Sequence, residues 1–119
     1  MNNLAIDYGT KNVGIAYSIN DIIFTEAIIN NDLNLIQNIS NLVKSHNIGK
    51  IYVGISEGKM AKLTMKFVDE MSAVIKLPIE TVEESVSTIE ATKIIKNSKN
   101  SLKKIDSVSA AVILQRVIS

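Results

Sequence analysis

The N-terminal stretch contains the feature that most constrains the fold: two apolar runs joined by a short turn around one aspartate. The first run, residues 4–6, ends at Asp7, and Val13 begins the second run after a turn that contains Gly9. Two such runs predict paired β-strands, with Asp7 at the edge of a sheet interior. A carboxylate among apolar side chains loses hydration free energy unless it accepts hydrogen bonds or binds a cation. Asp7 is therefore the first candidate functional residue, and the alternative is a turn aspartate bonded to its own backbone.

Composition narrows the class of protein. The chain has 119 residues, of which 46% are hydrophobic and 21% charged, and this predicts one globular domain over residues 1–119. It has no cysteine, which excludes disulfides and thiolate metal sites. The N-terminus lacks the charged start of a signal peptide, and no apolar stretch reaches the ~18 residues of a membrane span. We therefore expect a cytoplasmic protein without a membrane partner.

The distribution of lysines carries more information than the net charge of +1. Five lysines lie between Glu90 and Asp106 with no acid among them. They are Lys93, Lys96, Lys99, Lys103 and Lys104. Such a cluster can follow a phosphate backbone or can be a solvated face, and the sequence leaves both interpretations open. Aromatic residues make up only 4% and none is grouped with these lysines, so a base-stacking platform for single strands is not expected.

The apolar pattern predicts an α/β layer with the element order βββαβαβαα. The expected strands span residues 4–8, 13–18, 22–29, 51–55 and 79–83. The expected helices span about residues 32–46, 59–76, 86–96 and 105–118. Asn20 and Asp21 form the expected hairpin turn between the second and third strands. Asn31 or Asp32 is expected to cap the first helix, and Gly49 to end it.

Three carboxylates are expected to meet at one edge of this sheet. Asp7 would end the first strand, Glu84 follows the last strand, and Asp106 begins the final helix. Converging carboxylates without an arginine repel one another, and Mg²⁺ or Mn²⁺ would relieve that repulsion with hard oxygen ligands. Such a site can hold two metal ions ~4 Å apart and hydrolyse phosphodiesters in line. The alternatives are a helix cap for Asp106 and a solvated strand end for Glu83 and Glu84.

Four segments of the chain form a recognisable set of motifs. They are Ile6-Asp7-Tyr8-Gly9-Thr10-Lys11 with Val13-Gly14-Ile15-Ala16, Tyr52-Val53-Gly54, Val82-Glu83-Glu84 before Ser87-Thr88, and Lys103-Lys104-Ile105-Asp106-Ser107 with Ala110-Ala111-Val112-Ile113-Leu114. Together they resemble the YqgF family, small RNase H-like proteins described as Holliday junction resolvases and as pre-16S rRNA processing nucleases. The resemblance implies an α/β, RNase H-like fold with a five-stranded mixed sheet flanked by helices. It also implies a Mg²⁺- or Mn²⁺-dependent nuclease that acts on structured RNA or branched DNA.

The resemblance places the family's metal-binding acids on Asp7, Glu84 and Asp106, the same carboxylates that are expected to meet at the sheet edge. The chain departs from the family where phosphate-binding basic residues are usual. Asn12 stands where the family has a basic residue, and Ser85 replaces the arginine of its Asp-Glu-Arg triplet. Lysines are therefore expected to contact the nucleic acid. They are Lys11, Lys59, Lys99, Lys103 and Lys104.

Two other functions stay open at this point. The first is a catalytically weak or inactive YqgF-like scaffold that binds nucleic acid, which the missing arginines favour and the three acids oppose. The second is nucleotide binding, because an Asp-x-Gly-Thr turn also occurs in the actin and sugar-kinase superfamily, although those proteins need two such domains around the nucleotide. The chain is expected to be a monomer or a homodimer, since a resolvase acting on a symmetric junction needs a two-fold dimer.

Overall fold

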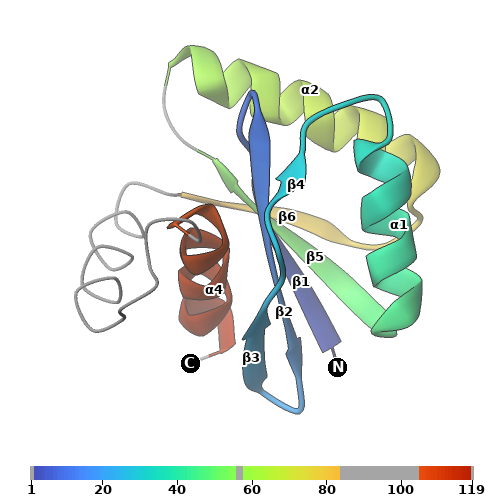
Figure 1. The fold of residues 1–119 in the computed structure, drawn as a ribbon, viewed down its shortest axis with the longest axis vertical. Helices are drawn as coiled ribbons and strands as arrows, with labels where there is room; N and C mark the ends of the chain where they lie inside the picture. The colour runs from blue at the N-terminus through green and yellow to red at the C-terminus, as the bar shows by residue number, and fades with distance from the viewer. Residues whose placement is uncertain (1, 56–57, 84–104, 119) are drawn as a thin grey trace.

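The fold is a mixed β-sheet between helices (Figure 1). The computed structural model describes residues 2–55, 58–83 and 105–118. The strands are β1 Asn2–Asp7, β2 Asn12–Ile19, β3 Ile22–Thr25, β4 Ile29–Asn30, β5 Ile48–Ile55 and β6 Ile79–Glu83. The helices are α1 Leu35–Ser45, α2 Lys59–Val74 and α4 Ile105–Ile118. The helix predicted over residues 86–96 lies outside the described residues.

The sheet has the order β3-β2-β1-β5-β6, which places β1 at its centre. β1 pairs antiparallel with β2 and parallel with β5, and β6 is parallel to β5. The short β4 pairs with the start of β2 and makes the sixth strand. The expected mixed sheet flanked by helices is confirmed, and parallel β1, β5 and β6 all end at one edge.

Both faces of the central strand are buried. Leu4 and Ile6 pack against α1 and α2, whereas Ala5 packs against α4 on the other face. All three side chains have no exposed surface. Figure 1 shows the same layers, with α4 on the side of the sheet opposite to α1 and α2. A continuously apolar strand fits this environment, because a strand covered on both faces has no solvated side.

The prediction of a continuous strand over residues 22–29 is wrong. The strand is interrupted after Thr25, and the chain resumes pairing with the same side of β2 as β4 at Ile29. The interrupted stretch, residues 26–28, faces only residues 14–15 of β2, so it carries one residue more than its partner. An extra residue breaks the ladder locally, as in a β-bulge. The alternation of apolar residues gave no sign of this extra residue.

The predicted hairpin turn is confirmed by its backbone angles. Asn20 has φ 52° and Asp21 has φ 65°, so both residues lie in the left-handed region. A two-residue connection with positive φ at both positions matches the right-handed twist of the paired strands. Ile19 and Ile22 therefore pair directly across the turn.

The predicted ends of the first helix are both wrong. Asp32 does not cap it; its Oδ1 accepts a hydrogen bond from the backbone N–H of Asn34 at 2.9 Å, and α1 begins at Leu35. This local bond forms a turn before the helix instead of a cap. At the other end Asn47, with φ 51°, takes the left-handed conformation that ends a helix, and Gly49 lies inside β5.

The described helices are short for membrane proteins. Within the described ranges, no helix is both long enough and apolar enough to cross a bilayer.

Candidate active site

Asp7 ends the central strand between two glycines. It lies in register with Gly14 of β2 on one side and with Gly54 of β5 on the other. Residues in register on neighbouring strands present their side chains on the same face of the sheet, with Cβ atoms about 5 Å apart. Neither neighbour has a side chain and both glycines are buried, so the strand register places no other side chain of β2 or β5 directly beside the half-buried Asp7.

The face on which Asp7 lies follows from the strand alternation. Ala5 packs in the cluster beneath α4, and a residue two positions along a strand returns to the same face. Val82 of β6 belongs to that same cluster. Asp7, Gly54 and Val82 form one row across three parallel strands, so β6 passes about 10 Å from Asp7. The carboxyl ends of β1, β5 and β6 thus meet beside Asp7, on the face that α4 covers.

The side chains of the other two predicted acids, Glu84 and Asp106, lie outside the described part of the structure. Glu84 lies outside the described residues, directly after β6. The backbone of Asp106 lies in the first turn of α4, as predicted, but its side chain is outside the described part. No group of three metal-binding side chains occurs among the described residues, which include only one of the three predicted carboxylates. The convergence of the three acids therefore stays a prediction.

A described contact between α4 and β6 involves the last turn of the helix. Nη1 of Arg116 donates to the carbonyl oxygen of Glu83 at 2.9 Å. Arg116, the chain's single arginine, therefore anchors the last turn of α4 beside the end of β6. Ten residues separate Arg116 from Asp106, so the backbone of Asp106 lies about 15 Å along the helix axis from this contact.

The turn after Asp7 is held in place by Asn31. Asn31 Nδ2 donates to the carbonyl oxygen of Gly9 at 2.7 Å, and its backbone N–H donates to the carbonyl oxygen of Lys11 at 2.9 Å. Gly9 has no room for a side chain, because a Cβ atom there would collide with the carbonyl oxygen of Asn12. The turn is thus fixed from both sides, and Asn31 is a functional candidate that the sequence analysis missed. It lies 22 residues from Gly9, so no local pattern could have indicated it.

Removing the Asn31 side chain will loosen this turn. We expect Asn31→Ala to lower the free energy of unfolding by about 1 kcal/mol, the usual net value of one part-buried hydrogen bond. Urea unfolding followed by circular dichroism measures the change. The matched control is Asn30→Ala, which removes the same atoms from the exposed neighbouring residue. Equal losses in the two variants would contradict the assigned role.

The two described candidate lysines lie near the same edge. Lys11 is exposed in the turn that follows Asp7, and Lys59 is the exposed first residue of α2. α2 follows the carboxyl end of β5 after a short connection. The remaining lysines of the prediction lie outside the described residues. They are Lys99, Lys103 and Lys104.

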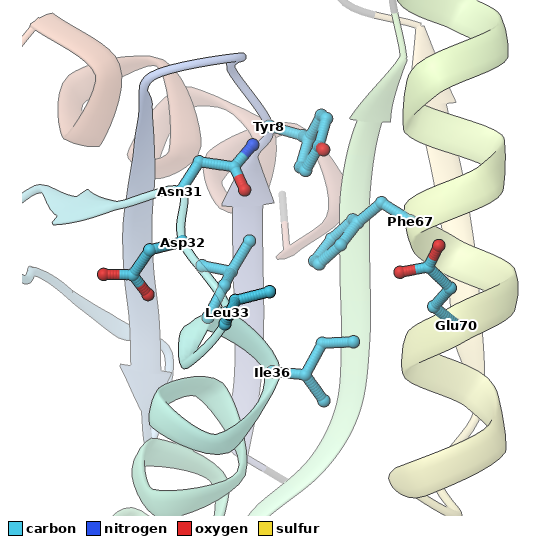
Figure 2. Close-up of a pocket in the computed structure, with 8 residues that line it drawn as sticks. Tyr8, Asn31, Asp32, Leu33, Ile36, Phe67 and Glu70 are labelled. Atoms are coloured by element: carbon cyan, nitrogen blue, oxygen red, sulfur yellow. The ribbon is translucent and has the colours of Figure 1, made fainter.

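A pocket of about 160 Å³ lies behind the Asp7 site, between β1, α1 and α2 (Figure 2). Tyr8 stacks on Phe67 of α2 with ring centroids 4.5 Å apart, and Figure 2 shows the two rings side by side. Small-molecule sites usually have ~300–1,000 Å³, so this pocket is too small for a nucleotide. The stacked rings of Tyr8 and Phe67 instead stabilise the fold, because they hold Tyr8, the residue after Asp7, against α2.

Comparison with known proteins identifies the family. The family described as "RuvX: Holliday junction resolvase" matches residues 1–119. The chain belongs to this family. The RuvX assignment confirms the resemblance drawn from the four motifs, and it makes the chain a member of a family of Holliday junction resolvases and pre-16S rRNA nucleases.

Curated relatives are similar over nearly their whole length. A protein of Sulfurihydrogenibium sp. (strain YO3AOP1) named "Putative pre-16S rRNA nuclease" is 34% identical over 126 residues, covering 94% of this chain and 86% of that protein. A protein of Buchnera aphidicola subsp. Baizongia pistaciae with the same name is 33% identical, covering 94% of this chain and 92% of that protein. This RuvX-family chain therefore aligns with these relatives over most of their length.

Solved structures confirm the fold. RuvC of T. thermophilus, in complex with Holliday junction substrate, superposes with a TM-score of 0.67 at 8% identity, covering 99% of this chain and 96% of that chain. The Fowlpox virus Holliday junction resolvase superposes with a TM-score of 0.58 at 16% identity, covering 98% of this chain and 96% of that chain. The RuvX-family chain therefore has the α/β, RNase H-like fold expected from its motifs.

Proposed function

We propose that this chain is a divalent-metal-dependent nuclease that hydrolyses phosphodiester bonds in structured nucleic acid of the cytoplasm. The observation that carries the proposal is the position of Asp7, at the carboxyl end of the central strand and between Gly14 and Gly54. Ligand sites of open α/β sheets favour that edge. The names of the relatives point to an rRNA precursor as substrate, and the family description points to a four-way DNA junction.

The proposed metal ligands are Asp7, Glu84 and Asp106. Glu84 follows Val82 by two residues in the sequence, and Val82 shares its face of the sheet with Asp7. Carboxylate oxygens are the ligands that Mg²⁺ and Mn²⁺ prefer. Asp7 supplies such an oxygen at the carboxyl end of the central strand, so the chemistry of the one described ligand fits this metal.

Bound divalent ions would supply a hydroxide nucleophile and stabilise the leaving oxygen of the phosphodiester. The chain's own residues would orient these partners. Asp7, on the central strand, is held by pairing on both sides and would give the site its fixed point. Lys11 and Lys59 would contact phosphates near the cleaved bond, as point charges without sequence preference.

A cleavage assay tests this function. Purified protein would be incubated with Mn²⁺ and either a structured rRNA precursor or a four-way DNA junction, and the products resolved on denaturing gels. Cleavage of the precursor alone would identify an RNA-processing enzyme, and cleavage of the junction alone would identify a resolvase. Absence of cleavage of both would overturn the proposal.

A nucleic-acid-binding scaffold is the second candidate function. It is favoured by Asn12, an exposed residue of β2 at a position where the family usually has a basic one. A scaffold would bind the same substrates without cleaving them and would gain no stability from divalent metal.

The chain could act in either role as a monomer or as a homodimer, and sedimentation of the complex with a four-way junction separates the two states.

The lysine cluster beyond β6 should contribute to substrate affinity. We expect the triple variant Lys99→Ala, Lys103→Ala and Lys104→Ala to reduce the slope of log Kd against log salt by about 2.7 on duplex substrate, because each phosphate contact contributes about 0.9. Fluorescence anisotropy over a salt series measures the slope. An unchanged slope would identify the cluster as a solvated face.

A further inference from the structure

One face of α2 carries a row of exposed lysines, of which the sequence predicted only Lys59 to contact nucleic acid. Lys59, Lys62 and Lys66 are all exposed and follow each other at helical spacings of three and four residues. These spacings place the three side chains on one face of the helix, along about 10 Å of its axis. We call Lys59, Lys62 and Lys66 the α2 lysine row.

The row works against the stability of the helix that carries it. Neighbouring like charges at these spacings repel each other, and positive charges in a first turn oppose the helix dipole. The first turn of α2 contains no acid, and its N-cap residue Gly58 makes no side-chain capping bond. The helix is held instead by its buried face, where Phe67 and Met71 pack into the core. A charge arrangement that opposes local stability is typical of a functional surface.

The charge of the row is not neutralised within the described part of the chain. None of its three ammonium groups forms an ion pair there, whereas Lys50 pairs with Glu80 at 3.0 Å. The acids of α2, Asp69 and Glu70, come after the row in the second half of the helix. The exposed face of α2 is therefore positive in its first half and negative in its second.

The positive half of α2 lies next to the sheet edge that carries Asp7. Gly54 is in register with Asp7, and Lys59 follows Gly54 by five residues, which span at most about 18 Å. Tyr8 stacks on Phe67, so α2 is also fixed directly against the end of β1. In Figure 1, α2 runs across the top of the sheet, where these strands end. Because α2 covers the face of the sheet opposite to the one on which Asp7 lies, a nucleic acid bound at Asp7 would reach the row by passing over this edge.

The chemistry of the row favours a double strand over a single strand. A duplex presents one negative charge per about 1.7 Å of its axis, so a rigid row of this length faces several phosphates. Single-strand binding surfaces combine positive charge with exposed aromatic platforms. The aromatic residue of α2, Phe67, is buried against Tyr8 and offers no such platform.

We propose that the α2 lysine row binds the phosphate backbone of a double-stranded segment of the substrate next to the cleaved bond. Its placement near the cleaved bond rests on the proposed nuclease function, but the duplex binding itself does not. Lys62 and Lys66 thereby join the nucleic-acid surface, to which the sequence pattern assigned only Lys59 on this helix. Their spacing within one helix was the signal that could have revealed them.

The test compares two double variants with equal net charge. Lys62→Gln with Lys66→Gln removes two charges from the row. Lys44→Gln with Lys76→Gln removes two charges from exposed positions at the end of α1 and beyond α2. Affinity for a blunt RNA duplex about two turns long, for a DNA duplex of the same sequence and for the corresponding single strand is measured by anisotropy over a salt series. EDTA is present throughout, so neither metal binding nor cleavage enters the readout.

We expect the row variant to lower the salt slope on duplex by about 1.8, from two lost contacts of about 0.9 each, and the control variant to leave it unchanged. The change on the single strand should be smaller. Comparison of the RNA and DNA duplexes identifies the nucleic acid that the row prefers. Urea unfolding should find the row variant about as stable as the wild type, because the loss of repulsion between Lys62 and Lys66 offsets the loss of attraction between Lys66 and the acids Asp69 and Glu70.

Three results would overturn the inference. They are equal slope changes in the row and control variants, a loss confined to the single strand, and no duplex binding by the wild type at low salt. A failure of the nuclease proposal would look different, because it would abolish cleavage in Mn²⁺ and leave duplex binding in EDTA intact.

Discussion

Asp7→Asn will reduce the rate of Mn²⁺-dependent cleavage by at least about 10³-fold, since metal charge stabilisation is worth several kcal/mol and each 1.36 kcal/mol is a factor of ten. The substitution keeps the size of the side chain and removes its charge. Asp7 pairs on both sides within the sheet, so the backbone has little freedom to bring another ligand into its place. Single-turnover cleavage of the rRNA precursor and of the four-way junction measures the rate.

The matched control for this experiment is Asp69→Asn. Asp69 is an exposed residue of α2, and its substitution makes the same change in net charge away from the sheet edge. Its cleavage rate should stay within about twofold of the wild type, because surface substitutions of this kind have small effects. An Asp7→Asn variant that cleaves like the control would remove Asp7 from the proposed catalytic site.

Metal binding will stabilise the wild-type fold and fail to stabilise the Asp7→Asn variant. An ion that binds only the folded state adds RT ln(1 + [L]/Kd), about 2.7 kcal/mol at a hundredfold excess over Kd. Without metal, the variant should be as stable as the wild type or more stable, because clustered carboxylates repel each other in the folded state. Thermal unfolding of both proteins, with Mn²⁺ and with EDTA, gives the four melting temperatures to compare.

This experiment separates the nuclease from the scaffold without knowledge of the substrate. A scaffold has no reason to bind the ion, so its melting temperature would be the same in Mn²⁺ and in EDTA. Asp69→Asn again serves as the control and should keep the full gain from metal. A gain that survives in Asp7→Asn would mean that the ion binds elsewhere, and it would contradict the assignment of Asp7 as a ligand.

Most of the sheet could be predicted from local patterns. The apolar run through Leu4 and Ile6 indicated the buried central strand, and positive φ at Asn20 and Asp21 follows from the residue types that hairpin turns select. The break after Thr25 could not be predicted. It depends on an extra residue relative to β2, which is a property of the pairing and not of either segment alone.

The candidate site, too, could be predicted only in part from the sequence. Asp7 could be selected from sequence, because a carboxylate at the end of an apolar run has few structural explanations. The pairing of Asp7 with Gly54 required the register of β1 on β5, which follows from a long crossover connection. The bond from Asn31 to Gly9 likewise joins residues that are far apart in the chain.

The sequence by itself determined the family, the α/β class, the central strand and the candidate acid Asp7. These depend on residue type and short-range spacing, both of which can be read directly from the amino-acid sequence. Only the tertiary structure decided that Asp7 lies between Gly14 and Gly54, that Asn31 fixes the turn, and that α2 presents its lysines beside the same edge. Strand register and helix placement are set by the packing of distant segments against each other, and that packing is a property of the whole chain.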